Sequence, residues 1–313
     1  MIDTIKIRVD FIDRDKLLHN GMKWRQELDS DTGEIIPLSS NLENIRLSIY
    51  GVSLYIEGSL PKLLLGNNIE TLKFEQIKEA IQIMEENTGL SLKDGIVTRL
   101  DLASTIEVDE TINKYLPLLF SCPRFKRLPN TKHSLSFLQS KTALKFYDKV
   151  KEFKAREGFI PQKYQGKNLL RYELMLKKSS IKSILKGTLT VENLLTESTY
   201  EIFLEEWRKR YNSIIILRDI DETIVKTPTD FMDYLIDEKV KSMGYDNVIS
   251  QINSLTDMSS KNKDRAKRKI KAVINKGYVK ESGLVQELNR KVEQVYQNVK
   301  QELIQNNNGN NNS

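Results

Sequence analysis

Apolar and polar residues alternate with a period of two along much of the first two-thirds of the chain. Because successive side chains of a β-strand point to opposite faces, this alternation predicts strands that bury one face and expose the other. The segments with this pattern are 4–12, 44–58, 95–105, 133–139, 142–150 and 168–178. Gly51 is predicted to bend the second segment into a hairpin, and Ser140 and Lys141 to form the turn between the fourth and fifth.

A helical pattern of apolar residues occurs once between these predicted strands and again throughout the chain after about residue 190. Residues 71–89 carry apolar side chains at helical spacing and end at Gly89, a residue type that commonly terminates helices. Strands interrupted by a helix, with hairpins among them, indicate an α+β domain built on a mainly antiparallel sheet. Four further helical segments follow, at 192–214, 227–243, 263–279 and 282–304.

This change in pattern predicts the domain organisation. We expect a sheet domain with packed helices over 1–190 and a separate α-helical module over 191–304, with Thr227 as one helix cap. The asparagine-rich end, 305–313, is polar low-complexity sequence that cannot bury a core, so it is predicted to be disordered.

Composition narrows the class of protein. Hydrophobic residues make up 39% and charged residues 29% of the 313 residues, as in soluble globular proteins. No apolar run approaches the roughly 20 residues that span a bilayer, so we expect a cytoplasmic protein without a membrane partner. Cys122 is the only cysteine, which excludes an internal disulfide and a cysteine-rich zinc site. A net charge of +6 permits a polyanionic partner without requiring one.

Charged residues gather on one face of three predicted strands. This face carries Arg99 and Asp101 from 95–105, Lys145, Tyr147 and Lys149 from 142–150, and Arg171, Glu173 and Lys177 from 168–178. Solvated sheet faces are usually polar, so charge alone carries little information. The repetition is more specific, because in two strands an arginine stands two residues before a carboxylate.

These residue types together fit phosphoryl-transfer chemistry. Asp101 and Glu173 are oxygen ligands of the kind that hold Mg²⁺ or Mn²⁺. Tyr147 could attack a phosphorus atom, and Lys145 and Lys149 on its own face are expected to favour the phenolate. Arginines on this face would bind backbone phosphates. The alternative from the pattern alone is a surface ion-pair network, with tyrosine chosen for its β propensity.

Five segments in order resemble the filamentous-phage gene II/X replication proteins and their plasmid relatives. They are "MIDTIKIRVDFID" from residue 1, "GSLPKLLLGNN" from 58, "VTRLDLA" from 97, "LKFYDKV" from 144 and "LLRYELMLKKSSIKSI" from 169. The resemblance covers about residues 1–190 and implies a rolling-circle nuclease-like fold. It also implies an enzyme that nicks one strand of a double-stranded origin and later rejoins the displaced strand.

The resemblance implies roles for individual residues. Tyr147 matches the nucleophile that forms a 5′-phosphotyrosyl bond and releases a 3′-hydroxyl primer, and Lys149 is retained two residues later. Asp101 and Glu173 match recurring acidic positions, which implies the Mg²⁺ or Mn²⁺ site. The implied partners are double-stranded and single-stranded origin DNA, a host helicase and a host DNA polymerase, in the cytoplasm of a bacterial cell.

The chain departs from the wider class of rolling-circle nucleases at its histidines. Many of those enzymes hold metal with a His-hydrophobe-His pair, whereas this chain has only His19 and His133 and no such pair. Ligands beyond the two carboxylates are therefore not assigned.

Further cations are candidate DNA contacts. Arg99, Lys145 and Arg171 lie on the charged face, and Lys62 lies in a segment that also reads as a plain connection. Lys267 and Arg268 belong to the dense basic run 259–280, which either grips DNA or is solvated helix surface. The helical module would aid origin binding or form a homodimer. The alternative functions are a non-catalytic origin-binding regulator and a tyrosine recombinase, the latter disfavoured because no Arg-His-Arg constellation is recognisable.

Overall fold

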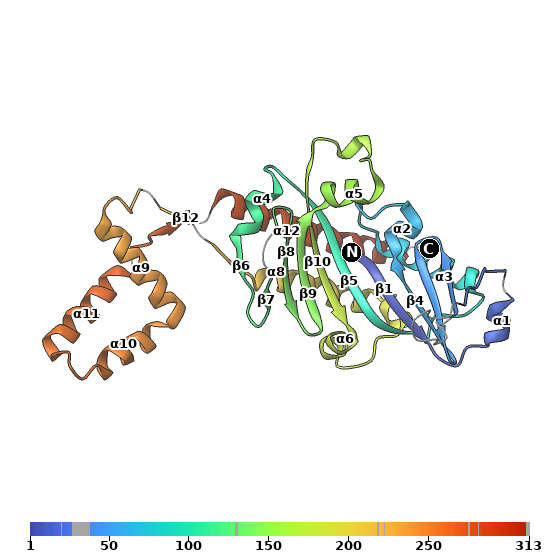
Figure 1. Ribbon diagram of the computed structural model, residues 1–313, viewed down its shortest axis with the longest axis horizontal. Helices are drawn as coiled ribbons and strands as arrows, with labels where there is room; N and C mark the ends of the chain where they lie inside the picture. The colour runs from blue at the N-terminus through green and yellow to red at the C-terminus, as the bar shows by residue number, and fades with distance from the viewer. Residues whose placement is uncertain are drawn as a thin grey trace. The chain divides into compact units, whose positions relative to one another are not determined.

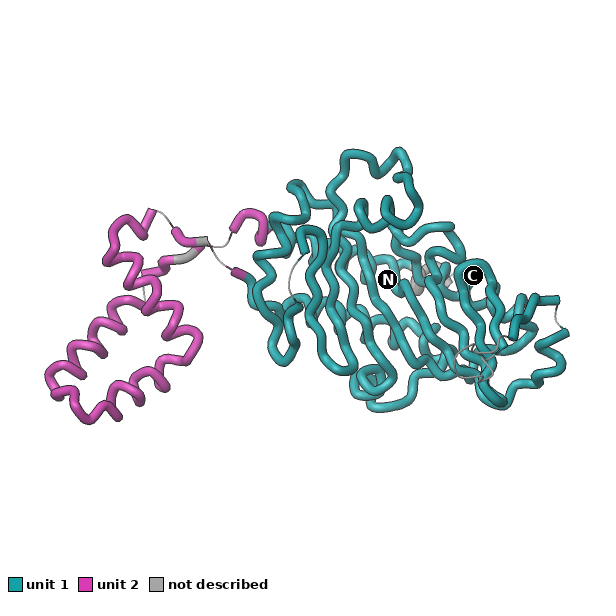
Figure 2. Tube along the Cα trace, viewed as in Figure 1, with its two compact units in different colours: residues 1–216, 287–313 teal, residues 217–286 magenta. Residues whose placement is uncertain are grey.

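The computed structural model describes residues 1–19, 21–26, 38–128, 131–217, 219–221, 223–274, 276–280 and 282–310 (Figure 1). The chain forms two compact units (Figure 2). Unit 1 comprises residues 1–216 and 287–313, and unit 2 comprises residues 217–286. The predicted α+β class is confirmed.

A nine-stranded antiparallel sheet forms the centre of unit 1, in the order β2-β3-β4-β1-β5-β10-β9-β8-β7. Its strands are β1 (Ile2–Val9), β2 (Leu38–Leu42), β3 (Ile45–Tyr50), β4 (Ser53–Ser59), β5 (Ile96–Val108), β7 (Lys126–Arg127), β8 (Ser134–Gln139), β9 (Thr142–Asp148) and β10 (Asn168–Lys177). The segments predicted from alternation are all present as strands. The hairpin at Gly51 and the turn at Ser140 and Lys141 are confirmed.

Helices surround this sheet. They are α1 (Arg14–Leu18), α2 (Leu60–Leu65), α3 (Phe74–Thr88), α4 (Ile112–Tyr115), α5 (Lys149–Glu157), α6 (Lys178–Leu185), α7 (Val191–Leu194), α8 (Glu197–Asn212) and α12 (Gly283–Asn310). Two 3₁₀ turns (Leu116–Leu118 and Gln162–Tyr164) and a small ribbon of β6 (Leu119–Ser121) with β11 (Ile215–Ile216) complete the unit. α3 ends at Gly89 in the left-handed conformation with φ of 66°, as predicted. No described helix is long and apolar enough to cross a membrane.

The core of unit 1 lies between the apolar face of the sheet and α8. Phe146 of β9 stacks on Tyr172 of β10 with ring centroids 4.6 Å apart, and Tyr172 meets Trp207 of α8 at 4.8 Å. The Tyr172 hydroxyl donates a hydrogen bond to the carbonyl oxygen of Trp207 at 3.1 Å. Tyr172 and Trp207 are fully buried, so α8 is an integral layer of the sheet domain.

The predicted domain boundary at residue 190 therefore differs from the structural division. An amphipathic pattern shows that a helix buries one side but does not show which surface it covers. Here α7 and α8 pack in unit 1, and α12 returns to it. Tyr115 donates a hydrogen bond to Glu287 of α12 at 2.5 Å, and Arg208 pairs with Glu293 of α12 at 2.7 Å.

Unit 2 is a small helical body. It contains β12 (Asp219–Ile220), α9 (Pro228–Met243), α10 (Tyr245–Ser254), α11 (Ser260–Val273) and β13 (Val279–Lys280), and β12 pairs antiparallel with β13. Thr227 caps α9, as predicted, and forms a reciprocal capping box with Asp230. α12 extends to Asn310, beyond the predicted end at 304, whereas residues 311–313 of the predicted disordered tail lie outside the described residues.

Candidate active site

The polar face of the sheet lies opposite the face that α8 covers. Strand register brings its charged residues together, because β10 pairs with both β5 and β9. Arg171 is opposite Tyr147, Glu173 is opposite Lys145, and Met175 is opposite Asp101. The face assignment predicted from alternation is therefore confirmed for these strands.

Tyr147 and Glu173 form the shortest contact among the predicted catalytic residues. The Tyr147 hydroxyl donates a hydrogen bond to Oε1 of Glu173 at 2.5 Å, between diagonal positions of adjacent strands. Burial raises the pKa of the Tyr147 hydroxyl well above its ordinary value, and the negative charge of Glu173 raises it further. Arg171 opposes this shift without reversing it. Burial and the charge of Glu173 therefore outweigh any stabilisation of the phenolate by Lys145 and Lys149 in this arrangement.

Lys149 is not a solvent-exposed strand residue. The strand ends at Asp148, whose side chain caps α5 by accepting from the amide of Lys151 at 3.0 Å. Lys149 is the first residue of this helix and is fully buried. Its Nζ donates to Oδ1 of Asn68 at 2.8 Å and to Oε2 of Glu152 at 2.7 Å, and it lies 5.9 Å from the centroid of the Tyr147 ring. Burial lowers the pKa of the Lys149 amine.

Arg171 is enclosed beside the tyrosine. Its side chain is 1% exposed and pairs with Asp3 at 3.1 Å and with Glu173 at 3.5 Å. It also donates to the Thr105 hydroxyl at 2.9 Å. A guanidinium this deeply buried does not reach a phosphate on the surface, so this arrangement does not favour the predicted DNA contact.

Asp3 is a residue of the candidate site that the sequence pattern missed. A register shift in β1 between Ile2 and Thr4 marks a β-bulge, and Asp3 is the extra residue. Its carboxylate accepts a hydrogen bond from Ser59 at 2.9 Å as well as pairing with Arg171. A bulge interrupts the two-residue alternation, so the alternation could not predict that Asp3 lies at this site.

A second ion-pair cluster lies on the same face around Arg99. Arg99 contacts both carboxylate oxygens of Asp101, at 2.9 and 2.6 Å, and Glu57 at 3.3 Å. Lys6 pairs with Glu57 at 2.8 Å. Burial raises the pKa of Asp101, although its bidentate pairing with Arg99 opposes the shift. The guanidinium group of Arg99, a predicted DNA contact, is thus already paired with two carboxylates.

The carboxylates as arranged do not fit a divalent metal site. Asp101 is held by Arg99, and Glu173 is held by Tyr147 and Arg171, so a metal ion would have to displace these partners. Within the described residues no group of three histidine, cysteine, aspartate or glutamate side chains is placed to hold a metal ion. His133 is exposed and contacts Lys151 at 3.1 Å.

The remaining predicted DNA contacts are spread over the chain. Lys145 is partly exposed and lies opposite Glu173 on β9. Lys62 belongs to α2, where it pairs with Glu157 at 3.7 Å. Lys267 and Arg268 belong to α11 of unit 2 and not to the sheet domain.

An open cationic pocket of about 560 Å³ adjoins the Arg99 cluster, and sequence reasoning missed it. It is lined by Lys6, Glu57, Thr98, Arg99, Lys141, Lys177, Lys178, Ser179 and Lys182. Within the described part of the chain, the ammonium groups of Lys141, Lys177, Lys178 and Lys182 have no ion-pair partner. The signal was the run "LKKSSIKSILK" at 176–186, where the strand passes directly into α6. We name this the lysine pocket.

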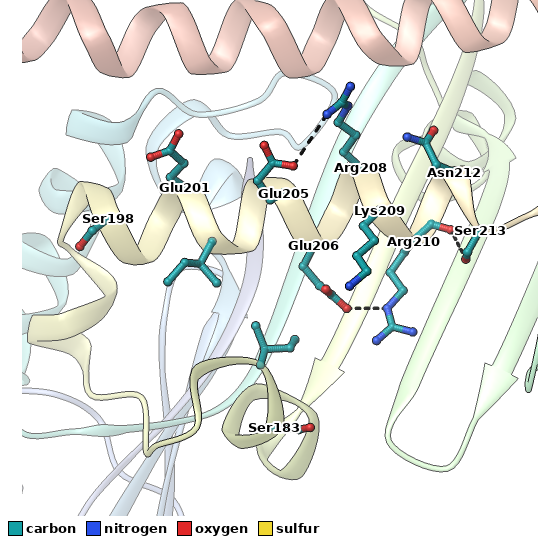
Figure 3. Close-up of a pocket in the computed structure, with 12 residues that line it drawn as sticks. Ser183, Ser198, Glu201, Glu205, Glu206, Arg208, Lys209, Arg210, Asn212 and Ser213 are labelled. Atoms are coloured by element: carbon teal, nitrogen blue, oxygen red, sulfur yellow. Dashed lines mark hydrogen bonds and ion pairs between the residues drawn. The ribbon is translucent and has the colours of Figure 1, made fainter.

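A larger hollow lies over α6 and α8 and contains none of the predicted site residues (Figure 3). Most of its charged side chains pair with each other or with α12, whereas Lys209 is exposed. Arg210 contacts Glu206 at 2.6 Å, and Arg208 contacts Glu205 at 3.9 Å, as the dashed lines show. Because most of these charges are already paired, the hollow offers no cluster of free catalytic groups.

Comparison with known families identifies the class of protein. A family model described as the N-terminal part of a replication-associated protein, the gene II protein of filamentous phage, matches residues 1–198. The chain belongs to this family. The predicted resemblance is thus confirmed, and membership supports a role for this phage replication-associated protein in the initiation of replication. The matched region contains Asp3, Asp101, Tyr147 and Glu173, whereas unit 2 lies outside it. No curated protein matches the chain.

Proposed function

We propose that this replication-associated protein nicks and rejoins origin DNA with Tyr147 as the nucleophile and Glu173 as its proton acceptor. The observation that carries the proposal is the 2.5 Å hydrogen bond from the Tyr147 hydroxyl to the Glu173 carboxylate. A general base must lie within hydrogen-bond reach of the proton that it removes. The raised pKa of Tyr147 makes this acceptor necessary, because phenolate is scarce at neutral pH.

The chemistry is a transesterification that conserves the number of phosphoester bonds. The Tyr147 oxygen forms a bond to phosphorus as its proton passes to Glu173, and the bond from phosphorus to the 3′ oxygen breaks. The 3′ oxygen takes a proton from solvent and becomes the primer hydroxyl. Rejoining is the reverse reaction: a 3′ hydroxyl loses its proton to solvent and attacks the phosphotyrosine, the bond from phosphorus to the Tyr147 oxygen breaks, and Tyr147 recovers its proton from Glu173.

The buried cations have positioning and electrostatic roles. Arg171 lies between Asp3 and Glu173 and so fixes the orientation of the proton acceptor. Lys149 places a positive charge 5.9 Å from the Tyr147 ring, where it would offset negative charge as the phosphate approaches. Asn68 and Glu152 hold that ammonium in place.

The lysine pocket is our candidate for the path of the DNA strand. Its four unpaired lysines lie beside Arg99 on the same unit as Tyr147. Unpaired ammonium groups bind phosphates without regard to base sequence, which suits a single strand held for cleavage. Together with Lys145 this pocket replaces Arg171 among the predicted DNA contacts of the sheet domain.

Metal and protein partners remain proposals from the family resemblance. Mg²⁺ or Mn²⁺ would need Asp101 or Glu173 to exchange its present cationic partner for the ion, so no step above depends on it. Host helicase, host polymerase and homodimerisation belong with the same proposal.

The test uses supercoiled plasmid that carries the DNA of the protein's own replicon. Wild-type protein with Mg²⁺ or Mn²⁺ should produce open circles with protein attached to the 5′ end. Tyr147→Phe should bind without nicking, whereas Tyr50→Phe, which changes an exposed tyrosine of the same sheet, should nick normally. A covalent adduct in Tyr147→Phe would refute the assignment. Binding without nicking by the wild-type protein would favour a non-catalytic origin-binding regulator.

A further inference from the structure

Unit 2 contains two helices joined by a short turn. α10 ends at Ser254 and α11 begins at Ser260, and both pack against α9 (Figure 1). Ser259 caps α11 by accepting a hydrogen bond from the amide of Asn262 at 3.4 Å. Two helices connected in this way against a third are a common framework for presenting one helix to the DNA major groove.

α11 is the most basic helix of the unit. Its fourteen residues include seven lysine or arginine residues and one aspartate. Ile270 and Val273 are buried and fix the inner side of the helix against the unit.

Several lysines of α11 have internal partners, Lys263, Lys267 and Lys269 among them. Lys263 donates to the carbonyl oxygen of Asn253 at 2.9 Å, and Lys267 pairs with Asp264 at 3.8 Å. Lys269 pairs at 2.5 Å with Asp233, an α9 residue whose side chain is 4% exposed. These contacts join α11 to its neighbours or shield its charge, so Lys267, a predicted DNA contact, is partly neutralised.

Three other cations of α11 form an outward stripe. Lys261, Arg265 and Arg268 are exposed and follow one another at spacings of four and three, which places them on one helical face. Among the described residues, Lys261 and Arg265 have no side-chain partner, and Arg268 contacts only the backbone oxygen of Asp264 at 3.4 Å. Asn262 lies exposed next to this stripe.

We propose that unit 2 binds double-stranded DNA with α11 in the major groove and this stripe toward the bases. The groove is about 12 Å wide and admits an α-helix. Arginine recognises guanine in a bidentate manner and asparagine recognises adenine, whereas lysine mainly contacts phosphate. Arg265, Arg268 and Asn262 therefore supply sequence preference, and Lys261 supplies affinity. This proposal does not depend on Tyr147 being the nucleophile.

The test measures binding of the full-length protein to overlapping labelled duplexes tiled across its own replicon. Arg265→Ala/Arg268→Ala should lose preferential binding to the best duplex by about tenfold or more for each arginine. Lys226→Ala/Lys239→Ala removes two exposed charges elsewhere in unit 2 and should change affinity by less than about threefold, a residual charge effect. Arg265→Lys/Arg268→Lys should keep salt-dependent binding but lose the preference among duplexes.

A second readout separates this proposal from the nicking proposal. Nicking of a single-stranded oligonucleotide that contains the cleavage site should be unchanged in Arg265→Ala/Arg268→Ala, and circular dichroism should show an intact fold. Equal losses in the arginine and lysine double variants would overturn the α11 assignment. Full retention of duplex preference in Arg265→Ala/Arg268→Ala would also overturn it.

Discussion

The most informative perturbation of the site is Glu173→Gln. Glutamine keeps the size of the side chain and can still accept a hydrogen bond from Tyr147 through its amide oxygen, but it cannot take up the proton. DNA binding should therefore persist, while the chemical step slows. The change separates proton transfer from the ion-pair and packing roles of the same residue.

The magnitude follows from the environment of Tyr147. A free phenol with a pKa near 10 is about 1% ionised at pH 8, and burial lowers that fraction further here because it raises the pKa. A positioned general base typically contributes about 10²–10⁴ in rate. We expect nicking by Glu173→Gln to fall by about this factor. Its rate should then rise about tenfold per pH unit, because the phenolate fraction does so below the pKa.

The assay is single-turnover cleavage of a labelled single-stranded origin oligonucleotide across pH 6–9, at several metal concentrations. The wild-type profile should be flatter than that of Glu173→Gln, because its rate does not depend on prior ionisation of the phenol alone. Wild-type rates in Glu173→Gln would refute the general-base role. Rescue by high Mn²⁺ without a steeper pH profile would instead show that Glu173 is a metal ligand.

Three further variants test the surroundings of the site. Arg171→Met leaves Asp3 as a buried charge without its partner and should cost about 3–5 kcal/mol in urea unfolding, so an unchanged midpoint would contradict the buried ion pair. Trp207→Ala should lower the free energy of unfolding by a similar ~3–5 kcal/mol if α8 is a layer of the sheet domain. Destabilisation of unit 2 alone would contradict this. Lys178→Ala/Lys182→Ala should weaken single-strand binding and reduce the magnitude of the salt slope by about 1.4, and an unchanged slope would exclude the lysine pocket.

The alternation of apolar and polar residues predicted the strands and their faces because it depends on the geometry of each strand and not on the loops that connect the strands. It brought Asp101, Tyr147 and Glu173 to one surface without any knowledge of strand order. The site departs from the prediction where the chain breaks that period. Asp3 enters through a bulge, and Lys149 turns inward because Asp148 begins a helix.

The helical half was harder to place for a different reason. Capping residues and apolar spacing located the helices, but they do not identify the surface that each helix covers. Contacts such as those of Trp207 with Tyr172, and of Glu287 with Tyr115, assign α8 and α12 to the sheet domain. The lysine pocket was missed because the lysine run of β10 and α6 meets residues of β1, β4 and β5 and the turn at Lys141, which lie far from it in the sequence.

The insertion of unit 2 ahead of most of α12 also sets an order of events during synthesis. Residues 217–286 must leave the ribosome before Glu287 and Glu293 can reach Tyr115 and Arg208. At about 5–20 residues per second, these seventy residues take several seconds to make. Throughout that interval the sheet domain lacks its last helix, so a nascent chain stalled within unit 2 would leave part of α8 uncovered and open to chaperones or proteases.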